Sequence, residues 1–133
     1  MTRAVALIAL SLLSGEVAPA PSGVTGYASA YAPGVMEDVI RWRLDTGTWR
    51  NPPPRDWYTA HGAIATNDCR QVGQMATLID PAGNHYEVLI ADCAGRDGGA
   101  SWMTRNRIVA ELDWRLWTRL TGEHGKPLEV TVK

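Results

Sequence analysis

The chain has 133 residues, of which 45% are hydrophobic, and its 13 basic and 14 acidic residues give a formal net charge of −1. This length suits one globular domain rather than two, and the hydrophobic content argues against a disordered chain. Nucleic acids and anionic membrane surfaces are bound through clustered Lys and Arg side chains, so the balanced charge argues against either as the main partner.

The first predicted element is a signal peptide over residues 1–20. Arg3 precedes the apolar run Ala4–Leu13, and small residues follow it, which is the pattern of an exported chain. The run is too short to cross a bilayer, so we expect no integral membrane segment after cleavage between residues 14 and 22. A buried N-terminal helix is the alternative. We therefore expect a secreted, periplasmic or cell-wall-associated protein with one domain over 21–133.

Short apolar runs broken by Gly, Pro, Asn and Asp predict a mainly β domain. The expected strands cover Val24–Tyr31, Tyr58–Ala65, Gln74–Ile79, His85–Ile90, Val109–Ala110 and Leu128–Val132. Residues 80–84 read Asp-Pro-Ala-Gly-Asn, and the proline and glycine supply the backbone angles of a tight turn. The third and fourth strands are therefore expected to form a β-hairpin.

Two segments between the strands have other patterns. Residues 36–57 contain three successive prolines, and we expect an inserted loop there with about one helical turn. Leucines recur at helical spacing over Leu112–Leu120, with Asp113 in a suitable N-cap position and Gly122 placed to end the helix. This pattern predicts one short amphipathic helix packed on a small barrel.

The two cysteines, Cys69 and Cys93, are expected to form a disulfide, because an exported chain folds in an oxidising compartment. Two buried free thiols are the alternative. The three histidines, His61, His85 and His124, have no metal-ligand spacing with the cysteines or with each other. We therefore expect no metal site and no cofactor.

Five short segments occur in a recognisable order. They are Gly26–Tyr31, Ala63–Asn67, Val72–Gly73, Val88–Cys93 and Val109–Asp113. This order, with a helix after the last segment, resembles the double-psi β-barrel of the rare lipoprotein A (RlpA), expansin and barwin group. The resemblance implies a six-stranded double-psi β-barrel with one short amphipathic helix after Glu111 and a ligand groove across the barrel. It also implies a disulfide at the places of Cys69 and Cys93.

The candidate catalytic acids are Asp92 and Glu111, which lie at the ends of expected strands and match acid positions of the resembled family. Hydrolysis of a glycan needs two carboxyl groups, whereas lytic transglycosylation can use one carboxyl group first as acid and then as base. Both residues also suit structural roles, Asp92 in a turn and Glu111 at the helix start. Asp68 is the fallback second acid.

Two departures from the family pattern weaken the case for two-carboxylate hydrolysis. Asn67 stands where the RlpA pattern has a histidine, and the aspartate that a related family of endoglucanases carries after the tyrosine of the first strand is absent after Tyr31. Asn67 and Tyr31 are nevertheless expected to contact substrate, because they lie beside the implied groove.

Tryptophan is the second signal for a glycan ligand, with six in the chain and no phenylalanine. Indole rings stack on the apolar faces of sugars. Trp102 lies in the glycine-rich segment 95–104, between the two candidate acids, and is expected to bind substrate. Trp49 and Trp57 are weaker candidates of the same kind.

Three functions are compatible with these residues. The first is a lytic transglycosylase that acts on peptidoglycan through one acid/base carboxyl group. The second is a non-catalytic polysaccharide- or wall-binding domain of the expansin or barwin kind, and the missing histidine favours it. The third is a secreted structural or partner-binding domain. For the first two, we expect a monomer whose partner is a cell-wall polysaccharide.

Overall fold

The computed structural model describes residues 23–49, 61–94, 98–122, 126 and 128–133. The strands are β1 (Val24–Ala30), β2 (Ala63–Thr66), β3 (Met75–Ile79), β4 (His85–Cys93), β5 (Ile108–Leu112) and β6 (Leu128–Val132). The helices are α1 (Val35–Thr46), η2 (Cys69–Gln71, a 3₁₀ turn), α3 (Gly99–Arg105) and α4 (Trp114–Thr121). The predicted signal peptide lies outside the described residues.

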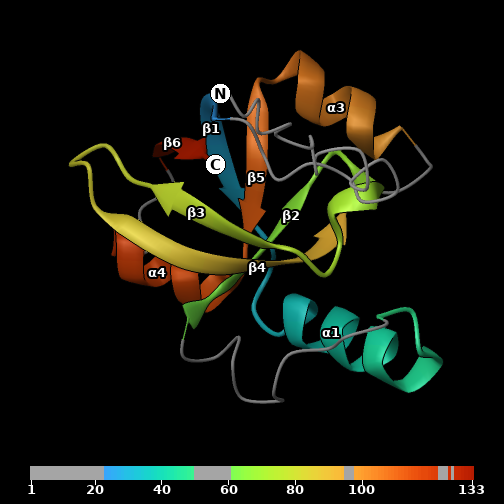
Figure 1. Ribbon diagram of the computed structural model, residues 1–133. Helices are drawn as coiled ribbons and strands as arrows, with labels where there is room; N and C mark the ends of the chain where they lie inside the picture. Colours follow the sequence, from blue (N-terminus) through green and yellow to red (C-terminus); the bar gives the residue numbers. More distant parts are fainter. Residues whose placement is uncertain (1–22, 50–60, 95–97, 123–125, 127) are drawn as a thin grey trace, which may run out of the picture.

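The six strands form a closed barrel in the order β1-β5-β2-β4-β3-β6 (Figure 1). Two of the pairings, β1 with β5 and β2 with β4, are parallel, and the other four are antiparallel. The expected hairpin joins β3 to β4, with Ile79 opposite His85. The predicted mainly β fold with a six-stranded barrel is confirmed.

Among consecutive strands, only β3 and β4 are neighbours in the barrel, and two of the separations concern the candidate acids. Strand β5 lies between β1 and β2, and β2 lies between β4 and β5. The chain therefore crosses β5 on its way from β1 to β2, and it crosses β2 on its way from β4 to β5. This crossing brings the last residues of β4 and β5 to the two sides of β2.

The barrel interior is filled by apolar side chains that alternate along the strands, as a half-buried strand requires. In β6, Leu128, Val130 and Val132 are buried while Glu129 is exposed. The interior cluster also contains Ala28, Ile64, Leu78, Val88, Ile90 and Leu112, with Leu116 and Trp117 of α4. Helix α4 therefore covers one part of the barrel core, as the leucine spacing predicted.

Helix α1 occupies most of the described part of 36–57, so the expectation of a loop with about one helical turn is wrong. The helix has 12 residues, and its buried side chains are Met36 and Ile40, with Leu44 partly buried. They pack against the outward face of β2 and β4, where Ala63, Ala65, Leu89 and Ala91 are buried. In Figure 1, α1 lies beside β4 on this side of the barrel.

The described residues contain three α-helices, so the expectation of a single helix is also wrong. Helix α4 confirms the predicted one: it follows Asp113, and Gly122 ends it with a φ of 63°, a left-handed conformation that glycine adopts at little cost. Helix α3 lies in the segment that was expected to be a glycine-rich loop, and it buries Met103. No helix in the described ranges is long and apolar enough to cross a membrane.

Candidate functional site

A register shift near the end of β4 decides where Asp92 points. Ile64 of β2 pairs with Ile90, but the next residue, Ala65, pairs with Asp92, so β4 carries one extra residue, Ala91. Such a bulge turns the following side chain to the other face of the sheet. Asp92 therefore lies on the outward face that α1 covers, instead of continuing the inward side of Ile90.

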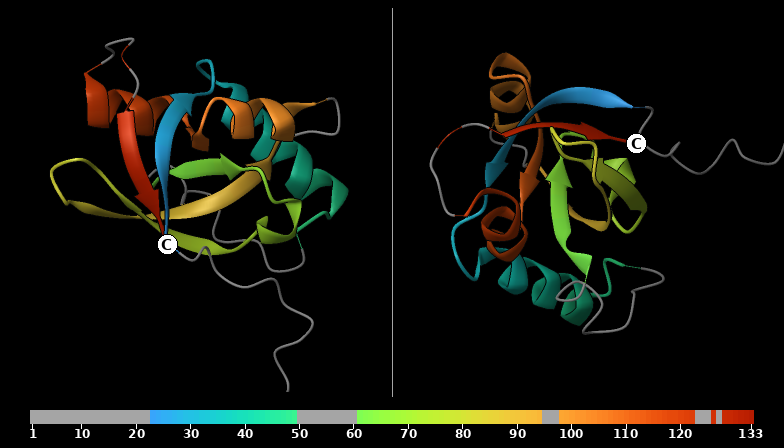
Figure 2. Two further views of the ribbon diagram at one scale, coloured as in Figure 1. Left: turned by 90° about the horizontal axis from the view of Figure 1, so that it is seen from above. Right: turned by 90° about the vertical axis from the view of Figure 1, so that its left-hand side faces the viewer.

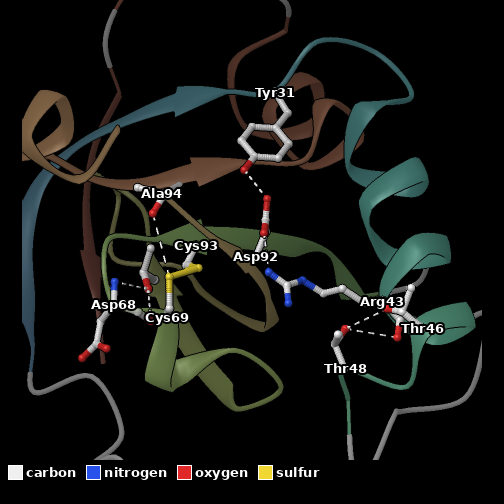
Figure 3. A network of polar contacts seen from close by, with 10 residues as sticks. Tyr31, Arg43, Thr46, Thr48, Asp68, Cys69, Asp92, Cys93 and Ala94 are labelled. Atoms are coloured by element: carbon white, nitrogen blue, oxygen red, sulfur yellow. Dashed lines mark hydrogen bonds and ion pairs between the residues drawn. A yellow bond between two sulfur atoms is a disulfide. The ribbon is translucent and has the colours of Figure 1, made fainter. Parts of the chain in front are cut away.

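Asp92 is held by donors from two other elements, as Figure 3 shows. The Tyr31 hydroxyl, just after β1, donates a hydrogen bond to Oδ2 at 2.7 Å. Arg43 Nη2, from α1, donates to Oδ1 at 2.6 Å and forms an ion pair with it. The side chains of Arg43 and Asp92 are only 13% and 17% exposed. Both carboxylate oxygens thus have a partner, and one of the partners is the guanidinium cation of Arg43.

Glu111 lies on the same face as Asp92, on the opposite side of β2. Ala65 pairs with Asp92 on β4 and with Glu111 on β5, so about two strand spacings, roughly 10 Å, separate the two Cα atoms. Burial raises the pKa of Glu111 above 4.5, and the negative charge of Asp92 raises it further. Among the described residues, no side chain hydrogen-bonds or ion-pairs with the Glu111 carboxyl group.

Tyr31 is kept in its neutral form. Burial raises the pKa of its hydroxyl far above 10, and the hydrogen bond to Asp92 and the charges of Asp92 and Glu111 raise it further, whereas Arg43 acts in the opposite direction. Tyr31 therefore donates its hydrogen bond to Asp92 as a neutral phenol.

These contacts give the two carboxyl groups different chemical characters. Asp92 is ion-paired with Arg43 and hydrogen-bonded to Tyr31. Glu111 is partly buried, and no cation in the described part of the chain pairs with it, so it holds a proton more readily than an ordinary glutamate. A pair of acids whose environments differ in this way is suited to general acid–base chemistry beside a fixed negative charge.

The structure does not bring Asp68 to this pair. Its carboxylate accepts hydrogen bonds from the Arg70 side chain at 3.0 and 2.8 Å and from the Arg70 backbone N–H at 3.0 Å. These hydrogen bonds hold its pKa below 3.8, and Figure 3 shows the carboxylate directed away from Asp92. Asp68 caps the 3₁₀ turn η2. Asn67, next to it, is exposed beyond the end of β2.

The disulfide between Cys69 and Cys93 is confirmed, with the two Cα atoms 4.9 Å apart. Cys93 follows Asp92 at the end of β4, and Cys69 begins η2. The bridge therefore ties the strand end that carries Asp92 to the segment after β2.

Trp102 is 44% exposed and lies on α3, where it lines an open cavity of about 640 Å³. Tyr27 and Ser29 of β1 line the same cavity, and Ser29 pairs with Glu111. Trp102 is therefore linked to Glu111 only through the cavity wall and the pairing of Ser29 with Glu111. Trp49 is only 6% exposed and packs under α1, which makes it a core residue, and Trp57 lies outside the described residues.

Arg43 is the site residue that sequence reasoning missed. It lies three positions after Ile40, and side chains at that spacing share one side of a helix. The recurrence of Met36, Ile40 and Leu44 at every fourth position was the available signal for a helix whose buried face borders Arg43. The prolines that follow this segment favoured a loop instead.

Within the described ranges, no group of three or more His, Cys, Asp and Glu side chains could hold a metal ion. No protein-family model matches the chain, and no curated protein matches it at a significant level. The functional conclusion therefore depends on the geometry of Asp92, Glu111 and their neighbours.

Proposed function

We propose that the chain is an exported cell-wall protein of the RlpA, expansin and barwin kind, and that it cleaves peptidoglycan as a lytic transglycosylase. The observation that supports this most directly is the pair Asp92 and Glu111 on one face, the first ion-paired with Arg43 and the second with a raised pKa. This combination matches a reaction that needs one proton-carrying carboxyl group.

The strand order supports the double-psi form of the barrel. In a psi loop, two consecutive strands are separated by a strand that hydrogen-bonds to both. Here β5 separates β1 from β2, and β2 separates β4 from β5, so the two loops would interlock. In this family the ligand groove crosses the barrel near the strand ends, which is where Asp92 and Glu111 lie.

In the proposed reaction, Glu111 first donates its proton to the oxygen of the glycosidic bond as the bond to C1 breaks. Positive charge then develops at C1 and the ring oxygen. The C6 hydroxyl of the same sugar attacks C1 and returns its proton to Glu111, which closes a 1,6-anhydro ring without consuming water. The carboxyl group thus ends the cycle protonated, as it began.

Asp92 would stabilise the positive charge that develops on the sugar. A fixed anion in a partly buried site interacts more strongly with such a charge than one in water does. Tyr31 and Arg43 act as positioning residues, because each holds one oxygen of Asp92. Arg43 also places a positive charge beside Asp92, whereas Asn67, at the position of the family's histidine, carries none.

The test is digestion of purified wall sacculi followed by mass spectrometry for anhydro-muropeptides. The wild-type protein is expected to release them, and Glu111→Gln is expected to reduce release by about 100-fold or more. Glu129→Gln, at an exposed position of β6, is the matched control and should keep full activity. Absence of anhydro products from the wild type, with the protein bound to the sacculi, would reject the enzyme.

A non-catalytic wall binder is the second candidate, and the exposed Trp102 beside a cavity favours it. An aromatic ring at a cavity mouth binds sugars without any need for an acid. This function predicts that sedimentation with sacculi survives Glu111→Gln and Asp92→Asn but not Trp102→Ala. It also predicts that no new reducing or anhydro ends form.

A further inference from the structure

The open cavity beside Trp102 has no part in the proposed reaction. In the left view of Figure 2, α3 and α4 lie on one side of the barrel with β1 between them, and all three elements contribute to the cavity wall. The volume of about 640 Å³ is in the range of small-molecule binding sites. Neither of the two candidate acids lines the cavity, so its purpose has to be sought in its own residues.

The cavity wall carries three aromatic rings and no charged side chain. The rings belong to Tyr27, Trp102 and Trp117, and the other lining residues are alanine, serine, asparagine and isoleucine. The strand partners of the lining residues include two acids, Glu111 and Glu129, but neither of them lines the cavity. Aromatic walls favour a ligand that has an aromatic ring of its own, because such rings stack.

A cation lies at the edge of this aromatic wall. The guanidinium carbon Cζ of Arg107 is 5.6 Å from the centroid of the Tyr27 ring, and both chain neighbours of Arg107, Asn106 and Ile108, line the cavity. In the described part of the chain, Arg107 forms no ion pair, and its guanidinium N–H groups donate no hydrogen bond. These donors are therefore available to an anionic group of a ligand.

The backbone around Arg107 is irregular in three ways. Arg107 has a φ of 57°, the only positive φ of a residue other than glycine in the described ranges. Its carbonyl oxygen accepts the Tyr27 N–H at 2.8 Å, and a Cβ atom at Gly26 would lie only 2.6 Å from that oxygen. Strand β5 also has an extra residue, Val109, between the partners of Tyr27 and Ala28. Irregular backbone of this kind gathers at binding sites, where the surrounding structure fixes it.

We propose that this cavity binds a small aromatic carboxylate, with its ring against Trp102 and Tyr27 and its carboxylate on Arg107. The ring gains stacking contacts from the wall, and a carboxylate matches the planar fork of guanidinium N–H donors. The size of the cavity suits a small molecule rather than a long chain. This site is independent of the proposed cleavage of peptidoglycan, because neither candidate acid contributes to it.

The experiment is calorimetric titration of the full chain with 3-phenylpropionate and with 3-phenylpropionamide. The two ligands have the same ring and nearly the same shape, but only the first is charged at neutral pH. The acid is expected to bind at least about tenfold more tightly, because it forms charge-assisted hydrogen bonds with arginine. Equal affinities, tighter binding of the amide, or no binding of the acid at millimolar concentration would overturn the proposal.

Arg107→Gln tests the carboxylate contact, and Arg105→Gln is its matched control. Arg105 is also exposed and also forms no ion pair within the described ranges, but it lines a different hollow, with Ser101 and Thr104. The Arg107 change is expected to weaken 3-phenylpropionate about tenfold and to leave the affinity for the amide unchanged. The unchanged amide affinity also shows that the variant is folded. Equal effects of the two changes on the acid would overturn the assignment to Arg107.

Trp102→Ala tests the ring contact, and Trp42→Ala is its matched control. Both tryptophans are exposed on helices, at 44% and 55%, but Trp42 is on α1 and does not line the cavity. The Trp102 change is expected to weaken the acid and the amide alike, by about 3- to 10-fold. The Trp42 change should leave both affinities as they are. Equal effects of the two changes would place the ring elsewhere and contradict the proposal.

Two other ligands are excluded by competition. The C-terminus of a peptide that ends in phenylalanine presents the same ring and carboxylate, so N-acetyl-glycyl-glycyl-phenylalanine is expected to bind no more tightly than 3-phenylpropionate. Tighter binding of the peptide would assign the cavity to a peptide partner and overturn the proposal. N-acetylchitohexaose is expected not to displace 3-phenylpropionate, and displacement would assign the cavity to a glycan instead.

Discussion

Two aspartates of this protein accept a hydrogen bond from a tyrosine, yet they belong to different kinds of structure. Asp80 lies in the turn between β3 and β4 and accepts from Tyr86 at 3.2 Å, from Asn84 Nδ2 at 3.0 Å, and from the backbone N–H groups of Ala82 and Asn84 at 3.0 and 2.9 Å. All these donors lie within six positions of it. Asp92 accepts from Tyr31 and Arg43, which lie 61 and 49 positions away.

The difference shows how a structural carboxylate is distinguished from a functional one. Burial acts to raise the pKa of Asp80, but its hydrogen bonds outweigh this effect and hold the pKa below 3.8; its partners are neutral and local, as a turn requires. Asp92 forms an ion pair with Arg43 of helix α1, and its charge acts on a second acid, Glu111. A carboxylate whose charged neighbours come from separate elements does more than hold a turn. Asp92 is therefore the better candidate for a catalytic role.

The largest expected difference between the two aspartates is in activity. Asp92→Asn is expected to lower the release of anhydro-muropeptides by about 100-fold, because the fixed negative charge near the sugar is lost. Asp80→Asn is the matched control and should retain full activity. Loss of the Asp92 charge also leaves Arg43 without its anion and should lower the free energy of unfolding in urea by about 1–3 kcal/mol. Similar activities of the Asp92→Asn and Asp80→Asn variants would show that the two aspartates do not differ in function.

The pH dependence sharpens the role of Glu111 beside Asp92. Glu111 must be protonated to donate, so kcat/KM is expected to fall as the pH rises through its raised pKa. The same shift affects stability: the folded state favours the protonated acid, so this contribution is complete below pH 4.5, the ordinary value, and is lost as the pH rises through the folded pKa. Glu111→Gln should therefore be more stable than the wild type at neutral pH.

Asp92→Asn provides the control for this pH dependence. The charge of Asp92 is the second cause of the raised pKa of Glu111, so its removal is expected to move the fall in residual kcat/KM to lower pH. A profile that keeps its position in the Asp92 variant would show that the two acids are not coupled.

Removal of the disulfide is expected to affect the Asp92 end of β4 more than the Asp80 end. A double Cys69→Ser and Cys93→Ser variant frees a loop closed over a separation of 24 residues, for which loop entropy predicts a loss of about 3.5 kcal/mol. Urea unfolding measures the loss, and hydrogen exchange should show faster opening near Asp92 than in the β3–β4 turn. Uniform protection along β4 would contradict a local role for the bridge.

The smallest effect is expected at Asp68. Its ion pair with Arg70 is at the surface, with the Arg70 side chain 75% exposed, and such pairs contribute little. Asp68→Asn should leave the release of anhydro products and the unfolding midpoint unchanged. A loss of activity comparable to that of Asp92→Asn would return Asp68 to the catalytic candidates.

Features with a local cause could be predicted from the sequence. The turn at residues 80–84, the alternation in Leu128–Val132 and the end of α4 at Gly122 each depend on neighbours within a few positions, and the structure has all three. The disulfide followed from export and from the places of the two cysteines. These signals located the barrel strands, whereas the two candidate acids were chosen from the resemblance to a known family.

Features with a distant cause could not be predicted in this way. Helix α1 is stabilised by packing of Met36 and Ile40 on alanines of β2 and β4, and the prolines after it pointed to a loop. Arg43 belongs to the candidate site only because this packing directs it to Asp92. Likewise, the extra residue Ala91 in β4 depends on pairing with β2, which the sequence of β4 alone does not reveal.

That extra residue in β4 makes the direction of the Asp92 side chain depend on strand pairing as well as on residue type. Regular pairing of every residue of β4 with β2 would set Ala91 opposite Ala65 and turn the Asp92 carboxylate toward the barrel interior, where Ile64 and Ile90 are packed. Deletion of Ala91 would instead leave Asp92 opposite Ala65, and therefore on the outward face, without a bulge. A comparison of related chains should therefore track the number of residues between Ile90 and Asp92 as closely as the substitutions.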